Sequence, residues 1–91
     1  MATRVSVDQF IHRAEQVCEK ALKQLDEAKK QEHYNIIEYN QAQQQLNEVY
    51  SDIEKLMMSS NKQQKERLYR MQLQIGRIQN DMILDEQDLM M

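Results

Sequence analysis

The sequence contains no proline and a single glycine, Gly76, among its 91 residues. Strand-rich folds need a turn roughly every 8–12 residues, and Gly, Pro and Asn-Gly pairs supply most of that turn chemistry. Gln, Glu, Lys, Arg, Ala, Leu and Met are abundant instead, and these residue types form helices at low conformational cost. The sequence therefore predicts an all-α fold.

The chain offers enough material for one domain but little for a wide core. Its apolar fraction is 41%, its aromatic fraction is 5%, and it has no tryptophan. A short chain also buries a smaller share of its surface than a long one. We therefore predict a single helical domain over residues 1–91, built around one thin seam of aliphatic side chains.

Apolar residues recur every three or four positions in three segments of the chain. This alternation averages about 3.5 residues per repeat, which is typical of helices that pack along a shared seam. The seam residues are Val7, Ile11, Ala14, Cys18, Ala21, Leu25 and Ala28; then Tyr39, Ala42, Leu46, Val49, Ile53 and Leu56; then Leu68, Met71, Ile75, Ile78 and Met82. We expect these side chains to form the core.

Capping-box signals separate the three segments. In a capping box, a side-chain oxygen accepts a hydrogen bond from a free N–H of the first turn, while a Gln or Glu three residues later reaches back. The boxes pair Ser6 with Gln9, Asn35 with Glu38, and Asn61 with Gln64. They predict helices over residues 6–32, 35–58 and 61–84. Residues 86–91 are expected to fray, as chain ends commonly do.

The same spacing permits an alternative architecture. The series that begins at Val7 continues to Tyr39 without a skip, and neither Gly nor Pro interrupts it. One helix over residues 6–58 would be roughly 80 Å long at about 1.5 Å per residue, with a shorter helix folded back on half of it. Its bare apolar stripe would need a second chain. We favour the antiparallel three-helix bundle and keep the dimeric long-helix coiled-coil hairpin as the alternative.

Acidic and basic side chains are segregated along the chain. Residues 32–58 contain five acids and one base, and residues 59–80 contain five bases and one acid. Antiparallel packing of these two segments brings opposite charges together. Because an exposed ion pair contributes only about 0–1 kcal/mol, the charges are expected to select helix register more than to stabilise the fold.

Candidate metal and catalytic residues each have a simpler interpretation. His12, Glu15 and Cys18 are spaced to share one helix face, but a zinc site needs four ligands and the second histidine is distant. Cys18 also falls on the apolar seam, where a thiol behaves as a small hydrophobe. Glu32 and His33 are interpreted as a loop before a capped helix. Since the sequence has neither a Gly-rich phosphate loop nor a nucleophile motif, we predict a non-enzymatic protein without catalytic residues, metal or cofactor.

The third segment carries the strongest candidate for a binding surface. A basic face over residues 62–77 is followed by an apolar end patch, and Gly76 is interpreted as a close helix approach or a neutral surface position. The candidate residues are Lys62, Lys65, Arg67, Arg70, Arg77, Met82, Ile83 and Leu84. A net charge of −3 argues against a general nucleic-acid binder. We therefore predict a protein partner or self-association, with a small nucleic-acid-associated regulatory factor as the alternative and no evident small-molecule substrate.

Location is indicated by three features of the sequence. No stretch reaches the roughly 18 apolar residues of a membrane span. The N-terminal residues lack the apolar region of a secretory signal. The single cysteine cannot form an internal disulfide. Together these features predict a cytoplasmic protein.

Two stretches of the sequence resemble a known family. The first is Lys30-Gln31-Glu32-His33-Tyr34-Asn35 with the residues that follow it to Leu46, and the second runs from Ser59 to Leu84. Both resemble the YtzC-like family of small proteins from spore-forming bacteria, over nearly the whole chain. The resemblance implies a bacterial, cytoplasmic origin. It implies no activity, so no functional residue is carried over from it.

Overall fold

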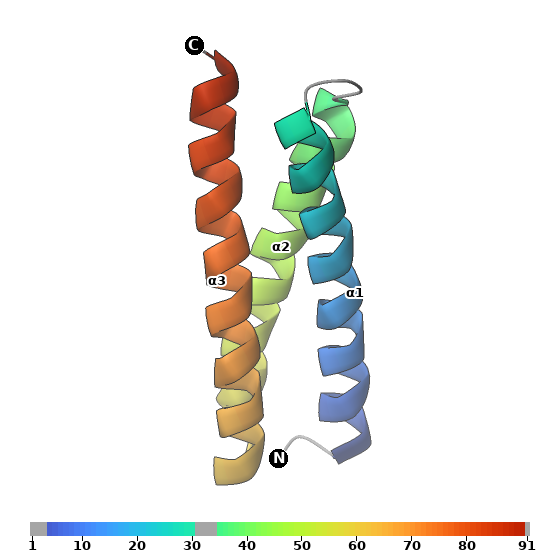
Figure 1. Ribbon diagram of the computed structural model, residues 1–91. Coiled ribbons are helices and arrows are strands. Elements are labelled where there is room, and N and C mark those ends of the chain that lie inside the picture. Colours follow the sequence, from blue (N-terminus) through green and yellow to red (C-terminus); the bar gives the residue numbers. More distant parts are fainter. Residues whose placement is uncertain (1–3, 31–34, 91) are drawn as a thin grey trace.

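The computed structural model describes residues 4–30 and 35–90, with side chains described for residues 6–30 and 35–85. It contains three helices, α1 (Arg4–Lys30), α2 (Ile36–Met57) and α3 (Lys62–Met90). In Figure 1, α1 and α3 run in one direction and α2 returns between them in the other. Each helix contacts the other two, within an overall envelope of 46 × 18 × 15 Å. The antiparallel three-helix bundle is thus the observed architecture, rather than the long-helix hairpin.

The predicted seams form the core. Every seam residue except Leu56 is buried, and Leu56 packs against the core from a partly buried position. The spacing of three and four keeps these side chains on one face of each helix, because residues at that spacing are neighbours on a helix surface. Burial of each large aliphatic side chain contributes about 1.5–3 kcal/mol. The core is therefore the main source of stability.

A buried tyrosine links α2 to α3. Tyr39 is fully buried, and its hydroxyl donates a hydrogen bond of 2.6 Å to the main-chain carbonyl of Met82. A buried hydroxyl without a partner is strongly destabilising, so this bond makes burial of the phenol possible. The contact fixes the start of α2 against the second half of α3.

Asparagine side chains begin two of the helices, as predicted. Asn35 Oδ1 accepts hydrogen bonds from the main-chain N–H groups of Ile37 at 3.0 Å and Glu38 at 3.2 Å. The Glu38 carboxylate points to α1, where it accepts a hydrogen bond of 3.3 Å from Gln24. Of the predicted Asn35–Glu38 box, the Asn35 half is thus confirmed, while Glu38 bonds to α1 and connects two helices.

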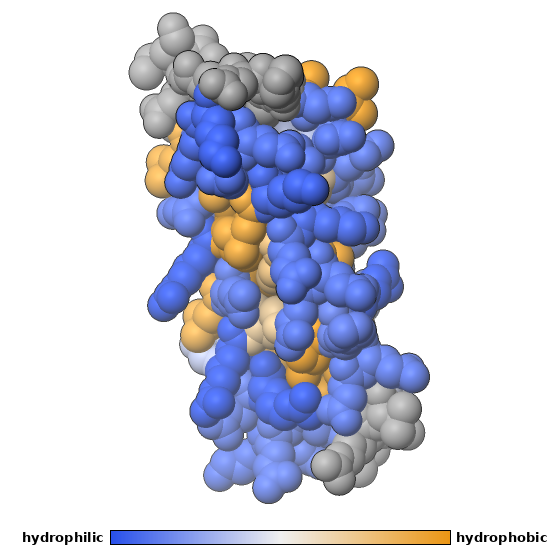
Figure 2. All heavy atoms as spheres, turned by 45° about the vertical axis from the view of Figure 1, so that its right-hand side comes forward, coloured by the Kyte–Doolittle hydropathy of each residue, from blue (hydrophilic) through white to orange (hydrophobic). Residues whose placement is uncertain are grey.

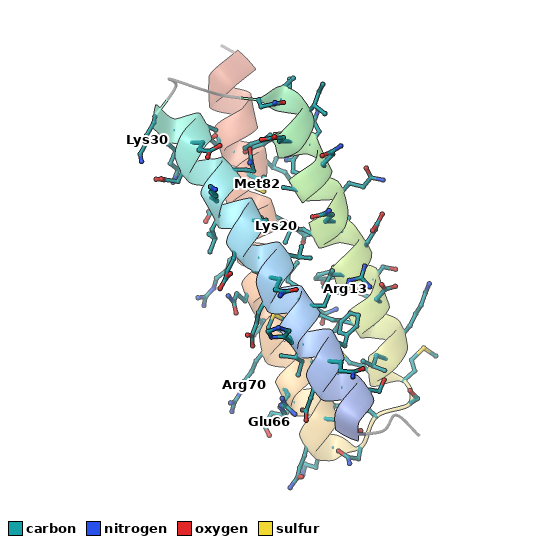
Figure 3. All side chains as sticks on the ribbon, turned by 90° about the vertical axis from the view of Figure 1, so that its right-hand side faces the viewer. Arg13, Lys20, Lys30, Glu66, Arg70 and Met82 are labelled. Carbon is teal, nitrogen blue, oxygen red and sulfur yellow. The ribbon has the colours of Figure 1, made fainter. Side chains whose placement is uncertain are left out.

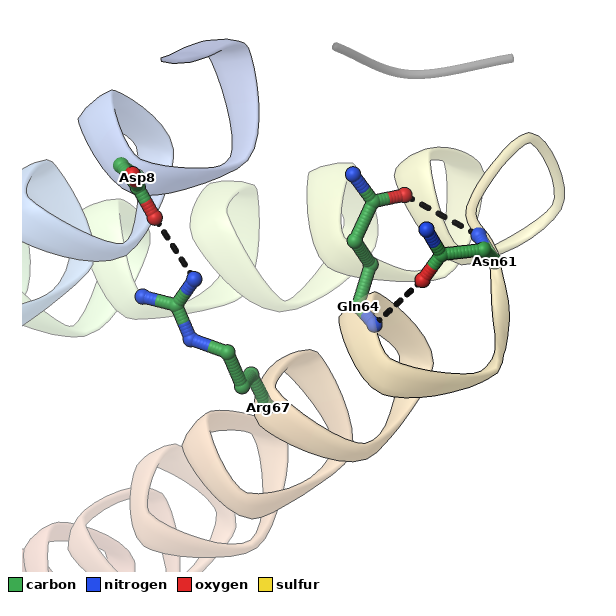
Figure 4. A network of polar contacts seen from close by, with 4 residues as sticks. All are labelled: Asp8, Asn61, Gln64 and Arg67. Carbon is green, nitrogen blue, oxygen red and sulfur yellow. Dashed lines mark hydrogen bonds and ion pairs between the residues drawn. The ribbon is translucent and has the colours of Figure 1, made fainter. Parts of the chain in front are cut away.

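The box at the start of α3 is fully reciprocal. The main-chain N–H of Gln64 donates to Asn61 Oδ1 at 2.9 Å, and the N–H of Asn61 donates to Gln64 Oε1 at 3.0 Å (Figure 4). Just before it, the Ser60 hydroxyl donates to the Leu56 carbonyl at 2.6 Å. These bonds satisfy free groups at the end of α2 and the start of α3, so the turn between them is well defined.

Two helix ends differ from the prediction, and a third predicted end lies outside the described residues. α1 begins at Arg4, so Ser6 lies inside the first turn and is not its N-cap. α3 continues to Met90, past the predicted end at residue 84, because no Gly or Pro follows Gly76 and the added residues include good helix formers. The predicted end of the first helix, with Glu32 and His33, lies outside the described residues. Fraying of residues 86–91 stays a prediction.

In the part of the chain that the structure describes, no ion pair joins α2 to α3, although residues 32–58 and 59–80 have opposite net charges. The ion pairs of the described residues join Asp26 to Lys30, Glu66 to Arg70, and Asp8 of α1 to Arg67 of α3. Between α2 and α3, two side-chain amides bond instead: Gln79 donates to Asn47 at 2.7 Å. Amides rather than charges occupy this contact, so the opposite charges of the two helices attract only at longer range.

Candidate protein-interaction surface

The basic residues predicted as a binding surface are not equally free to bind. Arg67 Nη1 donates to Asp8 Oδ1 at 2.6 Å, and this half-exposed pair holds α3 against α1 (Figure 4). Arg70 and Glu66 form an ion pair of 2.9 Å one helical turn apart (Figure 3). Three bases are exposed and form no ion pair with the described residues: Lys62, Lys65 and Arg77. A nucleic-acid role for this face stays a prediction, and two of its five bases are already neutralised.

The predicted apolar end patch loses one member to the core. Met82 is fully buried, and Figure 3 shows it between the helices. Ile83 and Leu84 are 50% and 53% exposed. Consecutive helical residues point about 100° apart, so a residue on the inner seam and its neighbours cannot share a face. The predicted patch is therefore divided, since Met82 lies in the core while Ile83 and Leu84 are exposed on different sides of α3.

A second apolar series runs along the outward face of α3. Tyr69 is 51% exposed and Leu73 is 50% exposed. Together with Gly76, Asn80 and Ile83 they follow a spacing of four, three, four and three residues. At about 100° per residue, these five positions fall within an arc of about 80°, opposite the core. We call Tyr69, Leu73, Gly76, Asn80 and Ile83 the outer seam.

Exposed apolar residues are concentrated on this helix. The described chain has eight large apolar residues that are exposed, and four of them are on α3. The eight are Leu22, Ile36, Ile37, Met58, Tyr69, Leu73, Ile83 and Leu84. On the α1 side of the molecule, by contrast, hydrophilic side chains cover most of the surface and apolar atoms emerge in separate patches (Figure 2). Single exposed apolar residues are ordinary, whereas a row of them along one helix is a candidate binding surface.

The outer seam escaped the sequence prediction although its signal was present. Each segment was assigned one seam, and in α3 that was the series from Leu68 to Met82. The outer series starts one position later, at Tyr69, and has the same alternation of three and four. Its polar and glycine positions, Asn80 and Gly76, weaken the apolar pattern. A search for two series in one helix would have found it.

Gly76 has no structural role inside the bundle. A Cβ atom built on Gly76 meets no atom within 4 Å. Glycine inside a helix is less favourable than alanine by about 1 kcal/mol. Of the two interpretations of Gly76, the close helix approach is therefore absent from the bundle, and the glycine lies on the outer seam with open space in front of it.

An open groove lies between α1 and α2. An open depression of about 470 Å³ lies near its lower end, and its lining includes Phe10 and Asp52. Arg13 and Lys20 line the next depression, opposite Glu48, and Figure 3 shows both bases on the side of α1 that faces α2. Basic and acidic walls face each other here without a contact ion pair among the described residues. Such a groove is open to water and brings no catalytic set together.

The residues considered as metal ligands differ in exposure. Cys18 is buried in the core, and its burial, followed by the nearby charge of Glu15, raises the pKa of the thiol. His12 is exposed, with its Nε2 3.4 Å from the side-chain amide of Gln16. Within residues 4–30 and 35–90, no three potential metal ligands converge. In the same residues, no helix is both long and apolar enough to cross a bilayer.

Comparison with known proteins identifies a family. The family described as "Protein of unknown function (DUF2524)" matches residues 1–84. The chain is 51% identical over 84 residues to the uncharacterized protein YtzC of Bacillus subtilis (strain 168), which covers 92% of this chain and 93% of that protein. No solved structure matches the chain. Neither the family nor the relative indicates an enzyme. The chain therefore belongs to the DUF2524 family, the YtzC-like proteins of spore-forming bacteria.

Proposed function

We propose that the protein is a non-enzymatic helical interaction module that binds a protein partner through the outer seam of α3. The observation that carries this proposal is the row of half-exposed apolar side chains at Tyr69, Leu73 and Ile83. The opposite face of the same helix already fills the core, so folding of one chain gives this row no cover. Covering it with a partner would remove apolar surface from water, which is the main driving force of association.

The residue types of the seam support a protein partner. Tyrosine and arginine are enriched in protein interfaces, and here Tyr69 lies on the seam while Arg70 and Arg77 flank it. The spacing of three and four residues is the pattern by which one helix packs against another. The partner surface is therefore another amphipathic helix, bound in a reducing, cytoplasmic setting.

A binding role without catalysis agrees with the rest of the molecule. The described residues bring no set of titratable groups together in an enclosed cavity, and general acid–base chemistry depends on such a site. The one thiol with a shifted pKa, Cys18, is shifted upward, away from nucleophilic reactivity. A small structural or regulatory protein is the class that fits these features.

Site-specific photo-crosslinking in living cells tests the proposal. A photo-reactive amino acid at Leu73, in a tagged chain expressed in Bacillus subtilis, is expected to give a defined crosslinked band. The matched control carries the same amino acid at Glu54, an exposed position in α2 that lies outside the outer seam. A Leu73 variant that crosslinks no more than the Glu54 control would contradict the proposal.

A further inference from the structure

We infer that the partner of the outer seam is a second copy of this chain, with α3 packed antiparallel on α3. This inference rests on the proposed function and names the partner for the same surface. Two kinds of feature in α3 support it: the position of Gly76, and the arrangement of charges along the helix and beside the seam.

The two halves of α3 have opposite charges, so the helix is complementary in charge to an antiparallel copy of itself. Residues 62–77 contain five bases and one acid, and residues 78–90 contain four acids and no base. Of the five bases, Lys62, Lys65 and Arg77 form no ion pair with the described residues. Two copies packed in parallel would place like charges side by side. Two antiparallel copies place the basic half of each α3 beside the acidic half of the other, and their helix dipoles also oppose. One surface thereby supplies both sides of the interface, as a two-fold dimer requires.

Gly76 lies at the midpoint of α3, which spans Lys62–Met90. A crossing near the middle lets two antiparallel helices overlap over most of their length. Because Gly76 has no side chain and open space in front of it, the two backbones can approach closely at this point. This role would account for a glycine that is unfavourable within the helix and unexplained within the bundle.

A two-fold axis near residue 78 matches the remaining seam positions. It places Leu73 of one copy opposite Ile83 of the other, and Gly76 opposite Asn80. The apolar side chains then meet each other, and the amide of Asn80 faces the space that Gly76 leaves. A single polar residue in such a seam specifies register and number of chains at some loss of stability.

Two charges that flank the seam lie close to the same axis. Arg77 and Asp81 are exposed, lie on the same side of the outer seam, and form no ion pair with the described residues. In a two-fold antiparallel pair, each flank of one helix meets the same flank of the other. Because the midpoint between Arg77 and Asp81 is residue 79, Arg77 of each copy comes within reach of Asp81 of the other, and Asp81 offsets the repulsion between the two Arg77 side chains beside the axis.

Sedimentation velocity of the purified full chain over a wide range of concentrations tests the inference. The wild type is expected to dimerise with a Kd in roughly the micromolar range, as for a small interface. Leu73→Glu and Gly76→Leu are each expected to weaken dimerisation by at least about tenfold, with the helical circular dichroism retained. Glu54→Arg, which changes an exposed charge of α2, is the control and is expected to leave the Kd unchanged.

Charge exchange makes the test specific for the Arg77–Asp81 contact. Arg77→Glu makes both positions acidic and Asp81→Arg makes both basic, so each variant alone is expected to dimerise at least about tenfold more weakly. An equimolar mixture of the two variants is expected to recover the dimer as a heterodimer. Failure of the mixture to recover it would overturn the assignment of this contact.

Thiol crosslinking tests the antiparallel orientation. Cys18 is buried, so the wild type serves as the unreactive control. With a short bismaleimide, Asn80→Cys, close to the axis, is expected to give crosslinked dimers. Lys62→Cys, at the end of α3, is expected to give none, because the two ends lie far apart in an antiparallel pair. Efficient crosslinking through position 62 would overturn the antiparallel arrangement.

The outcomes separate this inference from the proposed function. A wild type that stays monomeric at every concentration, or a dimer insensitive to Leu73→Glu, overturns self-association through α3. If the Leu73 photo-crosslink in cells then captures a different protein, the proposed function stands and only the second copy is excluded. If it captures neither another protein nor a second copy, both proposals fail.

Discussion

Replacing Gly76 by alanine separates the stability of the bundle from its association. The new Cβ atom meets no atom within 4 Å, so it adds no clash, and alanine is favoured over glycine inside a helix by about 1 kcal/mol. We therefore expect Gly76→Ala to raise the free energy of unfolding by about 1 kcal/mol. For a domain of this size, that corresponds to a rise in Tm of roughly 4–8 °C.

The assay is urea or thermal unfolding followed by circular dichroism, at a concentration well below the Kd of the dimer. Gln44→Ala, at an exposed position inside α2, is the control and is expected to change the free energy by less than about 0.5 kcal/mol. The same Gly76→Ala chain is expected to dimerise more weakly than the wild type. A monomer that is destabilised by Gly76→Ala would refute the open environment of Gly76. A dimer that is unaffected would refute the close crossing there.

Three further predictions concern the bundle itself. Tyr39→Phe removes the hydroxyl that donates to the Met82 carbonyl, and it is expected to lower the free energy of unfolding by about 0.5–1.5 kcal/mol in a urea titration. An unchanged free energy would mean that this hydrogen bond adds no net stability. Asn61→Ala removes the side-chain oxygen that accepts in the α3 capping box, and it is expected to lower the free energy of unfolding by about 1 kcal/mol. The control is Asn40→Ala, at an exposed position within α2, which is expected not to destabilise the bundle. Burial raises the pKa of the Cys18 thiol above its ordinary value of 9.0, so the folded thiol stays protonated at pH values where the unfolded thiol begins to ionise. The thiol is therefore expected to react with an alkylating reagent near pH 8 only as fast as the bundle opens, and reaction as fast as that of a cysteine peptide would contradict its burial.

The core was predictable because one physical rule determines it. Residues such as Leu46 and Ile75 recur at the helical period, and the only way to bury that series is to turn it inward. Asn35 and Asn61 were predictable for a similar reason, since a short polar side chain can satisfy the free N–H groups of a first turn only from that position.

Features that depend on competition between partners were not predictable from local sequence. Glu38 could bond to its own capping box or to another helix, and only the position of Gln24 decides between them. Arg67 was assigned to a basic surface, but the register of α1 on α3 brings Asp8 within reach of it. The end of α3 was underestimated because the predicted stop relied on the last seam residue, whereas a helix continues until its backbone meets an obstacle.

α3 differs from α1 and α2 in having two seams, one that fills the core and one that faces outward. A short chain with a thin core is marginally stable by itself, and a dimer through the outer seam would bury α3 on both faces. Because a partner that binds only the folded state adds stability by mass action, the Tm of the wild type is expected to rise with protein concentration. The Tm of Leu73→Glu is expected to stay constant over the same range, since its dimer is lost while its core is intact. Differential scanning calorimetry at several concentrations measures both. A Tm that is independent of concentration in the wild type would mean that α3 gains its second cover from a different partner, or from none.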